Sequence, residues 1–204
     1  MPLFYQHNIN QHTKLALWNI TEDEDFFVKR VQLKKEINHP HKRLQHLAGR
    51  YLLWLLEPRF PLHLIEVAGS NKPLLSNEAF HFSISHCGDF AAAIVSEDKV
   101  VGIDVELVQA KIAAIKKKFL SEAEQALVPS ADIQTLTLLW SCKEAVYKWY
   151  GKGGLDFKDH MVIKEMSIAG DQGMVACDFM KGGETRLEIS CHLFRQLCLA
   201  WIVA

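Results

Sequence analysis

The segment between Phe80 and Val108 constrains the fold most, because three short strand-like runs follow one another there with very short connections. The runs read FHFSIS, FAAAIVS and VVGIDVELV, and the turn-like triplets Cys87-Gly88-Asp89 and Glu97-Asp98-Lys99 separate them. Alternation of apolar and polar residues with a period of two is typical of strands. Parallel neighbours need a long crossover connection, so this segment predicts three strands in an antiparallel meander.

Helical patterns precede this segment. Thr21, followed by four acidic residues, is typical of a helix start and predicts a helix to about Ile37, which His39-Pro40 would end. Apolar residues at helical spacing predict a second helix over 42–56.

The second half of the chain repeats this order. Residues 111–118 form an amphipathic basic segment, Ser121 and Glu124 have capping-box spacing, and a long helix is predicted over about 132–150, ended by the glycines of GKGG. Residues 161–203 alternate again and predict three or four strands, with turns at Gly170, Gly173 and Gly182-Gly183. We therefore expect an α+β protein with two similar halves, 1–100 and 101–204.

Composition narrows the class of protein. The chain has 204 residues, a formal net charge of −1 and 49% hydrophobic residues, which gives no overall field toward nucleic acid or membrane. Five scattered cysteines without C-x-x-C spacing predict buried free thiols. We expect a cytoplasmic protein, because the sequence shows neither a secretory signal nor an apolar run of membrane-spanning length.

Two carboxylates in Gly102-Ile103-Asp104-Val105-Glu106 are the first candidate functional residues. Alternate residues of a strand share a face, so Asp104 and Glu106 point the same way while Ile103 and Val105 point into the core. A hard cation such as Mg²⁺ would relieve their repulsion. The alternatives are a solvated face of an edge strand, or a pair of acids answered by lysines.

Glu144 and Lys148 lie four residues apart in the long predicted helix, which is apolar over most of its circumference. Charges in such a helix cost free energy unless they are paired or functional. Glu144 is therefore a candidate third metal ligand, and Lys148 a candidate phosphate contact. The alternative is a surface i,i+4 ion pair, which contributes only about 0.2–0.5 kcal/mol.

Several cations and one histidine complete the set. His86 ends the strand that contains Ser85, where it is accessible and rigidly held, and it is either a phosphate donor or merely structural. Arg43 and Arg50 of the second helix, with Lys72 before Pro73, suit phosphate groups, although most surface cations are simply solvated.

The order of these features resembles the phosphopantetheinyl transferases, in particular the larger, monomeric, surfactin-synthetase-activating type. The resemblance runs over residues 43–150 through Lys72-Pro73, Ser83-Ile84-Ser85-His86, Gly102–Glu106, the F-L-S-E-A-E block and Trp140–Lys148. Two positions depart from the usual pattern: Asn71 replaces a glycine before Lys-Pro, and Cys87 replaces a serine after His86.

The resemblance implies a pseudo-dimer with a long helix on a small antiparallel sheet in each half and an active site in the cleft between them. It implies a holo-[acyl-carrier-protein] synthase or 4′-phosphopantetheinyl transferase, which moves the 4′-phosphopantetheine arm of coenzyme A onto a serine of an apo acyl or peptidyl carrier protein and releases adenosine 3′,5′-bisphosphate. The partners are then coenzyme A and the carrier, with no nucleic acid or membrane.

The resemblance also implies roles by motif position. Asp104, Glu106 and Glu144 would bind Mg²⁺, and Glu144, Lys148 and Glu124 would be catalytic. The general base would be Glu144, Glu124 or a metal-bound hydroxide. Glu124 looks like the position proposed as base in part of the family, and its competing role is in the capping box. The coenzyme A contacts would be Arg43, Arg50, Lys72, Pro73, Ser85, His86, Asp104 and Lys148.

Other readings of the same residues stay open at this point. A Mg²⁺-dependent phosphohydrolase could use the same carboxylates, although such enzymes usually gather more of them for two metals. A carrier-binding module without activity is a third possibility. The basic segment with Lys111 and Lys116–Lys118 is either a surface for an acidic carrier protein or a solvated amphipathic helix.

Overall fold

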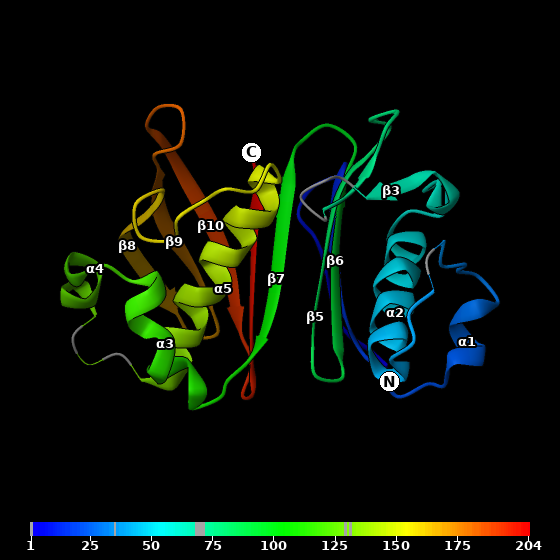
Figure 1. Cartoon of the computed structure of the whole chain (residues 1–204), viewed down its shortest axis with the longest axis horizontal. Coiled ribbons are helices and arrows are strands. Elements are labelled where there is room, and N and C mark those ends of the chain that lie inside the picture. The colour runs from blue at the N-terminus through cyan, green and yellow to red at the C-terminus, as the bar shows by residue number, and fades with distance from the viewer. Residues whose placement is uncertain (1, 35, 68–71, 129, 131) are drawn as a thin grey trace. The chain divides into compact units, whose positions relative to one another are not determined.

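The computed structural model describes all residues except 1, 35, 68–71, 129 and 131 (Figure 1). The chain divides into two compact units, Met1–Ile103 and Asp104–Ala204. Each unit combines helices with an antiparallel sheet, so the α+β class is confirmed.

The first unit has a four-stranded sheet with the order β1-β2-β6-β5, in which all neighbouring pairs are antiparallel. A separate two-stranded ribbon pairs β3 with β4. The elements are β1 (Leu3–Asn8), β2 (Thr13–Asn19), α1 (Glu24–Val28), α2 (Pro40–Leu56), the 3₁₀ helix η1 (Leu62–Leu64), β3 (Ile65–Val67), β4 (Pro73–Leu75), β5 (His81–Cys87) and β6 (Phe90–Ser96).

The core of this unit lies between α2 and one face of the sheet. Leu47, Leu52 and Leu53 of α2 meet Trp18 of β2 and Val95 of β6, and all five are buried. The helix approaches β5 closely, because a Cβ on Gly49 would lie 2.5 Å from the Ile84 side chain. Only glycine allows this approach.

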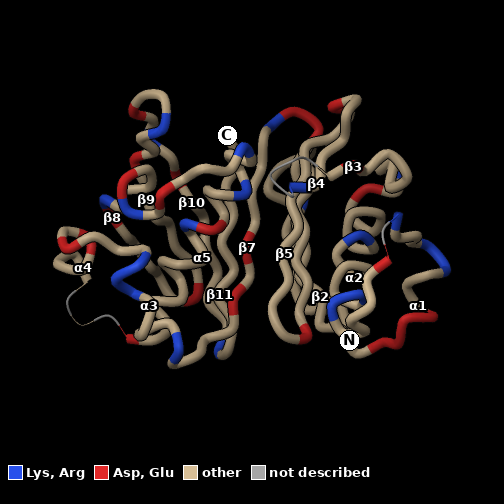
Figure 2. The backbone as a smooth tube through the Cα atoms, in the orientation of Figure 1, with Lys and Arg blue, Asp and Glu red and all other residues tan. Residues whose placement is uncertain are grey.

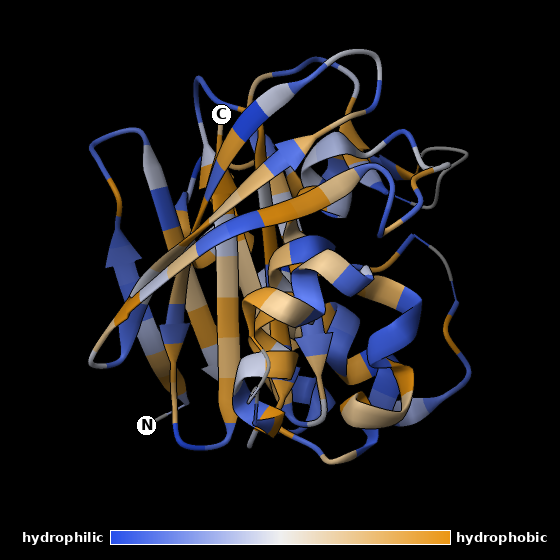
Figure 3. Cartoon of the chain, turned by 90° about the vertical axis from the view of Figure 1, so that its left-hand side faces the viewer, coloured by the Kyte–Doolittle hydropathy of each residue, from blue (hydrophilic) through white to orange (hydrophobic). Residues whose placement is uncertain are grey.

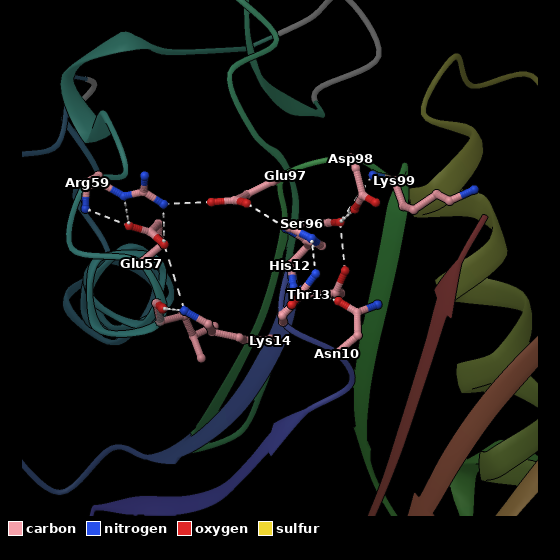
Figure 4. A network of polar contacts seen from close by, with 12 residues as sticks. Asn10, His12, Thr13, Lys14, Glu57, Arg59, Ser96, Glu97, Asp98 and Lys99 are labelled. Atoms are coloured by element: carbon pink, nitrogen blue, oxygen red, sulfur yellow. Dashed lines mark hydrogen bonds and ion pairs between the residues drawn. The ribbon is translucent and has the colours of Figure 1, made fainter.

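A polar network joins the C-terminal end of α2 to β2 and β6 (Figure 4). Arg59 donates to Glu57 at 2.8 Å and to Glu97 at 2.6 Å, and Glu97 also contacts His12 at 2.9 Å. These contacts satisfy the charges around the end of the helix and hold the turn after β6.

The second unit has a five-stranded sheet with the order β7-β11-β10-β9-β8. The strands nearest the viewer in Figure 3 carry both hydrophilic and hydrophobic residues. The elements are β7 (Val101–Leu107), α3 (Lys111–Phe119), α4 (Glu122–Leu127), α5 (Ile133–Tyr150), β8 (Met161–Ala169), β9 (Gln172–Phe179), β10 (Thr185–Leu193) and β11 (Leu197–Val203).

Helix α5 covers this sheet through a buried face that includes Cys142 and Val146. Asp132 caps its first turn by accepting from the Thr135 amide, and Gly151 ends it in the left-handed conformation at φ 69°. The five cysteines of the chain are free, as predicted, and all but Cys87 are buried.

Three sequence predictions about elements were wrong. Residues 3–19 form a β-hairpin ahead of the helices, and the helix predicted from Thr21 to Ile37 is only α1, which Asp23 caps. Pro40 does not end a helix but occupies the first turn of α2, where its missing N–H is harmless. Gly173 lies within β9 rather than in a turn.

The meander prediction was half right. β5 and β6 form an antiparallel hairpin with Cys87 opposite Phe90, but β7 lies in the other sheet, beside β11. None of the helices that the structure describes is long and apolar enough to cross a membrane.

Candidate functional site

Asp104 lies in a strand that is buried on both faces. Asp104 is only 3% exposed, and its neighbours Ile103 and Val105 are 0% and 1% exposed. The solvated-face alternative for this carboxylate is therefore excluded. A carboxylate this deeply buried needs a partner, because burial without one costs several kcal/mol.

Lys148 supplies that partner from the last turn of α5. Its Nζ donates to Asp104 Oδ1 at 2.6 Å. Lys148 thus reaches across to β7 instead of pairing along its own helix. A cation in the last turn also interacts favourably with the carbonyl end of the helix.

Trp140 orients Glu106, a contact that sequence reasoning missed. The indole Nε1 donates to Glu106 Oε1 at 3.1 Å. The indole itself is held between Phe119 and Phe157, with ring centroids 5.2 Å away on each side. Trp140 precedes Glu144 by four residues, so helical spacing alone places both on one face of α5.

Glu144 makes no hydrogen bond or ion pair with any residue that the structure describes. Burial, and then the negative charge of Asp104, raise its pKa from 4.5 to about 7; Glu106 adds to the rise and Lys148 opposes it. The surroundings of Glu144 therefore disfavour its anionic form.

The pKa of Glu144 makes the stability of the free protein depend on pH. The folded protein holds this proton up to about pH 7, while the unfolded chain releases it near 4.5. Stability from this group is present below pH 4.5 and is lost as pH rises to about 7, by at most roughly 3 kcal/mol.

The donor set fits a divalent cation. Asp104, Glu106 and Glu144 offer only oxygen ligands, which Mg²⁺ prefers. With Lys148 counted, the formal charge of the four ionised groups is −2, and the charge of Asp104 adds to the effect of burial in raising the pKa of Glu144. Among the described residues, no three His, Cys, Asp or Glu side chains converge closely enough to hold a metal ion in this structure.

Glu124 is occupied by structural contacts. Its Oε2 accepts from the Ser121 amide at 2.7 Å, which completes the predicted capping box, and its Oε1 accepts from the Ile163 amide at 2.8 Å. The same Oε1 lies 2.6 Å from Nζ of Lys143, which is fully buried. Both oxygens are thus engaged, which favours the structural role over that of a base.

Lys143 is the second residue that sequence reasoning left without a role. Its Nζ also donates to the carbonyls of Phe119 and Phe157, at 2.6 and 2.7 Å. Burial lowers its pKa, and Glu124 opposes that effect. These contacts fix α5 against α3, α4 and the loop after α5, and so fix the direction in which Glu144 points.

The candidate phosphate cations lie in the first unit and differ in their surroundings. Arg43 is engaged, because its Nε donates to Glu24 at 2.7 Å and its Nη1 to the Ile37 carbonyl at 3.1 Å. Arg50 lies two turns further along α2, and its side chain hydrogen-bonds only to His46 among the described residues. The geometry thus favours Arg50 over Arg43 as the anion contact.

The remaining residues predicted to contact coenzyme A lie in β5 and at the start of β4. His86 is exposed, and its ring centroid lies 5.3 Å from that of His46, whereas Ser85 is buried. Lys72 is half-buried before Pro73 at the start of β4, and burial lowers its pKa. Asn71 lies outside the described residues.

Comparison with known proteins identifies the family. A model of the 4′-phosphopantetheinyl transferase superfamily matches residues 100–200. The chain is 38% identical over 95 residues to 4′-phosphopantetheinyl transferase psf-1 of Bacillus pumilus, which covers 44% of this chain and 40% of that protein. It is 29% identical over 111 residues to enterobactin synthase component D of Salmonella austin, covering 52% and 47%.

A third relative is 4′-phosphopantetheinyl transferase AcpT of Escherichia coli O157:H7, with 29% identity over 126 residues, 58% of this chain and 64% of that protein. The chain thus matches less than two thirds of the length of each of these relatives. The range matched by the family model contains Asp104, Glu106, Glu144 and Lys148. Over residues 100–200 the chain thus matches the 4′-phosphopantetheinyl transferase superfamily.

We predict that Glu124→Ala lowers the free energy of unfolding by about 3–5 kcal/mol, because it leaves Lys143 charged and buried without its partner. Urea unfolding measures the change. The matched control is Glu122→Ala in the same helix turn, where an exposed acid near a helix start contributes less than about 1 kcal/mol. Equal stability of the two variants would contradict the structural role.

Proposed function

We propose that the protein transfers the 4′-phosphopantetheine arm of coenzyme A to a serine of an apo carrier protein, in a Mg²⁺-dependent reaction that releases adenosine 3′,5′-bisphosphate. The observation that carries the proposal is the carboxylate cluster of Asp104, Glu106 and Glu144, with Lys148 on Asp104, inside the range that the family model matches. The proteins named as relatives are 4′-phosphopantetheinyl transferases and an enterobactin synthase component.

In the proposed reaction the serine Oγ attacks the β-phosphorus of coenzyme A. A bond forms between these atoms, and the bond from the β-phosphorus to the oxygen that bridges to the α-phosphate breaks. The leaving bisphosphate takes the electron pair. Catalysis of such a transfer is mostly positioning and neutralisation of the charge that develops on the phosphate oxygens.

Asp104, Glu106 and Glu144 would hold Mg²⁺, which supplies neutralising charge to the pyrophosphate when it is bound. Lys148 is already held beside this group of acids and would contact the transferred phosphate. Trp140 would keep Glu106 in position through the indole N–H.

The serine proton needs an acceptor. Glu144 suits this role better than Glu124, because Glu144 has no hydrogen-bond partner among the described residues and both oxygens of Glu124 are engaged. A pKa of about 7 matches a base that works near neutral pH. We therefore assign the proton to Glu144 and the structural role to Glu124.

The predictions from sequence about the oligomeric state, the coenzyme A contacts and the location are part of the same proposal. The presence of two α+β units in one chain is in keeping with the monomeric, two-half type. Arg50, Lys72 and His86 would hold the phosphates of coenzyme A, with Pro73 and Ser85 beside them. A cytoplasmic location stays a prediction.

We predict that the protein, incubated with coenzyme A, MgCl₂ and a promiscuous apo carrier, raises the carrier mass by one phosphopantetheine arm. Mass spectrometry of the carrier measures the product. Excess EDTA should abolish the gain, and Glu144→Gln should reduce its rate roughly 10²-fold or more. Inorganic phosphate without a mass gain would support a hydrolase, and carrier binding without any product would support an inactive module.

Helix α3 offers a surface for the carrier. Ile112 and Phe119 anchor it in the core, while Lys111, Lys117 and Lys118 are exposed and Lys116 is partly so. The blue stretch along α3 in Figure 2 shows how these lysines follow one another. We propose that this surface receives an acidic face of the carrier protein, because complementary charge speeds encounter and fixes orientation.

Reversal of Lys116, Lys117 and Lys118 to glutamate should raise the KM for the carrier and leave the KM for coenzyme A unchanged. Steady-state kinetics with each substrate varied in turn measures both. The matched control reverses three scattered lysines, Lys99, Lys158 and Lys181, which changes the net charge equally. Carrier kinetics that respond equally to both triple variants would contradict this surface.

A further inference from the structure

Ser141, in the middle of α5, carries a buried hydroxyl group without a hydrogen-bond partner. The residue is 0% exposed, and its Oγ meets no donor or acceptor among the residues that the structure describes. Thr137, one turn earlier, shows the usual solution for a hydroxyl inside a helix, because its Oγ1 donates to the Ile133 carbonyl at 2.7 Å. Ser141 makes no such bond within the described chain, and a buried hydroxyl in this state costs free energy.

Helix geometry places Ser141 on the face of α5 that carries the candidate site. At 3.6 residues per turn, Ser141, Glu144 and Lys148 lie within about 60° of one another around the helix axis. Trp140 and Lys148 both contact acids of β7, so this face is directed at that strand. Ser141 and Glu144 come between these two residues in the sequence, and they therefore lie between the two contacts along the helix as well.

Each acid of β7 accepts a hydrogen bond from α5, whereas Glu144 does not have a donor. Asp104 accepts from an ammonium group at 2.6 Å, and Glu106 accepts from an indole N–H at 3.1 Å. Glu144 makes no hydrogen bond or ion pair within the described chain. Residues three apart on a helix have Cβ atoms about 5–6 Å apart, so the Ser141 hydroxyl and the Glu144 carboxylate are within reach of each other. An unused donor and an unused acceptor are thus neighbours on one face.

We propose that Ser141 is a positioning residue of the acidic site, whose hydroxyl donates to the Glu144 carboxylate when a divalent cation holds that carboxylate ionised. The inference rests on the proposed function for the presence of the cation. A hydrogen bond to one oxygen of Glu144 leaves the other oxygen for the cation, and bonds to an ionised acceptor are the stronger ones. In the geometry that the structure shows, the hydroxyl only lowers stability, so its contribution comes with the bond to Glu144.

Ser141→Ala should therefore have two effects of opposite sign. Removal of a buried hydroxyl that has no partner stabilises the fold, because the cost of its desolvation disappears. The same change weakens cation binding, because Glu144 loses the donor that we propose for it. A serine that served only the packing of the helix would give the reverse result, which is lower stability with unchanged cation binding.

The test uses the whole protein at pH 8, where Glu144 is mostly ionised because its pKa is about 7, and Mn²⁺ alone as the probe of the cation site. Electron paramagnetic resonance of free Mn²⁺ measures the dissociation constant, and urea unfolding in EDTA measures stability. For Ser141→Ala we expect a dissociation constant at least about tenfold higher and a higher urea midpoint.

The matched control is Thr137→Val, which removes a satisfied hydroxyl of similar burial from the same helix face. Its urea midpoint should fall, because the Ile133 carbonyl loses its donor, and its Mn²⁺ affinity should equal that of the wild type. The two variants together separate the loss of a hydroxyl as such from the loss of the hydroxyl beside Glu144.

The outcomes separate this inference from the proposed function. If Ser141→Ala binds Mn²⁺ as tightly as the wild type, the inference is wrong and the transfer reaction is unaffected. If it binds Mn²⁺ more weakly but loses as much stability as Thr137→Val, the hydroxyl is structural and the inference is again wrong. If the wild type shows no saturable Mn²⁺ binding, the proposed cation site is wrong, and the inference with it. If both expected effects occur but no arm reaches an apo carrier, the inference stands and the transfer activity does not.

Discussion

Repulsion among Asp104, Glu106 and Glu144 is the interaction on which the site depends. Two of these acids come from β7 and the third from α5, and burial of Glu144, followed by the negative charge of Asp104, raises the pKa of Glu144 to about 7. Lys148 neutralises only part of that charge. A protein gains no stability from such an arrangement, which is in keeping with our proposal that these acids hold a cation.

The buried pair of Lys143 and Glu124 makes this arrangement possible. Lys143 and Glu144 are neighbours on α5, and the first is fixed by three buried acceptors while the second has no hydrogen bond within the described chain. The contacts of Lys143 therefore set the rotation of the helix, and Glu144 is left available for the role that we propose for it. The capping box of Ser121 and Glu124 also holds Glu124 in place beside Lys143.

The helix and strands around the candidate site in the second unit could be predicted from the sequence, because the residues that mark each element lie within that element or next to it. Asp132 and Gly151 bound α5, and alternation marks β7 to β11. It missed β2 because Leu15, Ala16 and Leu17 are all fully buried, so the strand has no polar face to reveal a period of two. It assigned β7 the wrong neighbour, since a short connection does not fix pairing when another sheet competes. Arg43 and Arg50 look equivalent in sequence, and only the tertiary partner Glu24 separates them.

The stability of the free protein tests the central claim most directly. Urea unfolding of the wild type and Glu144→Gln is compared at pH 5 and pH 8, in EDTA and in MgCl₂. The account predicts that in EDTA the variant is more stable than the wild type at pH 8, by at most roughly 3 kcal/mol, and nearly equal at pH 5. It also predicts that MgCl₂ stabilises the wild type at pH 8 and removes most of this difference. A difference that depends on neither pH nor Mg²⁺ would contradict the account.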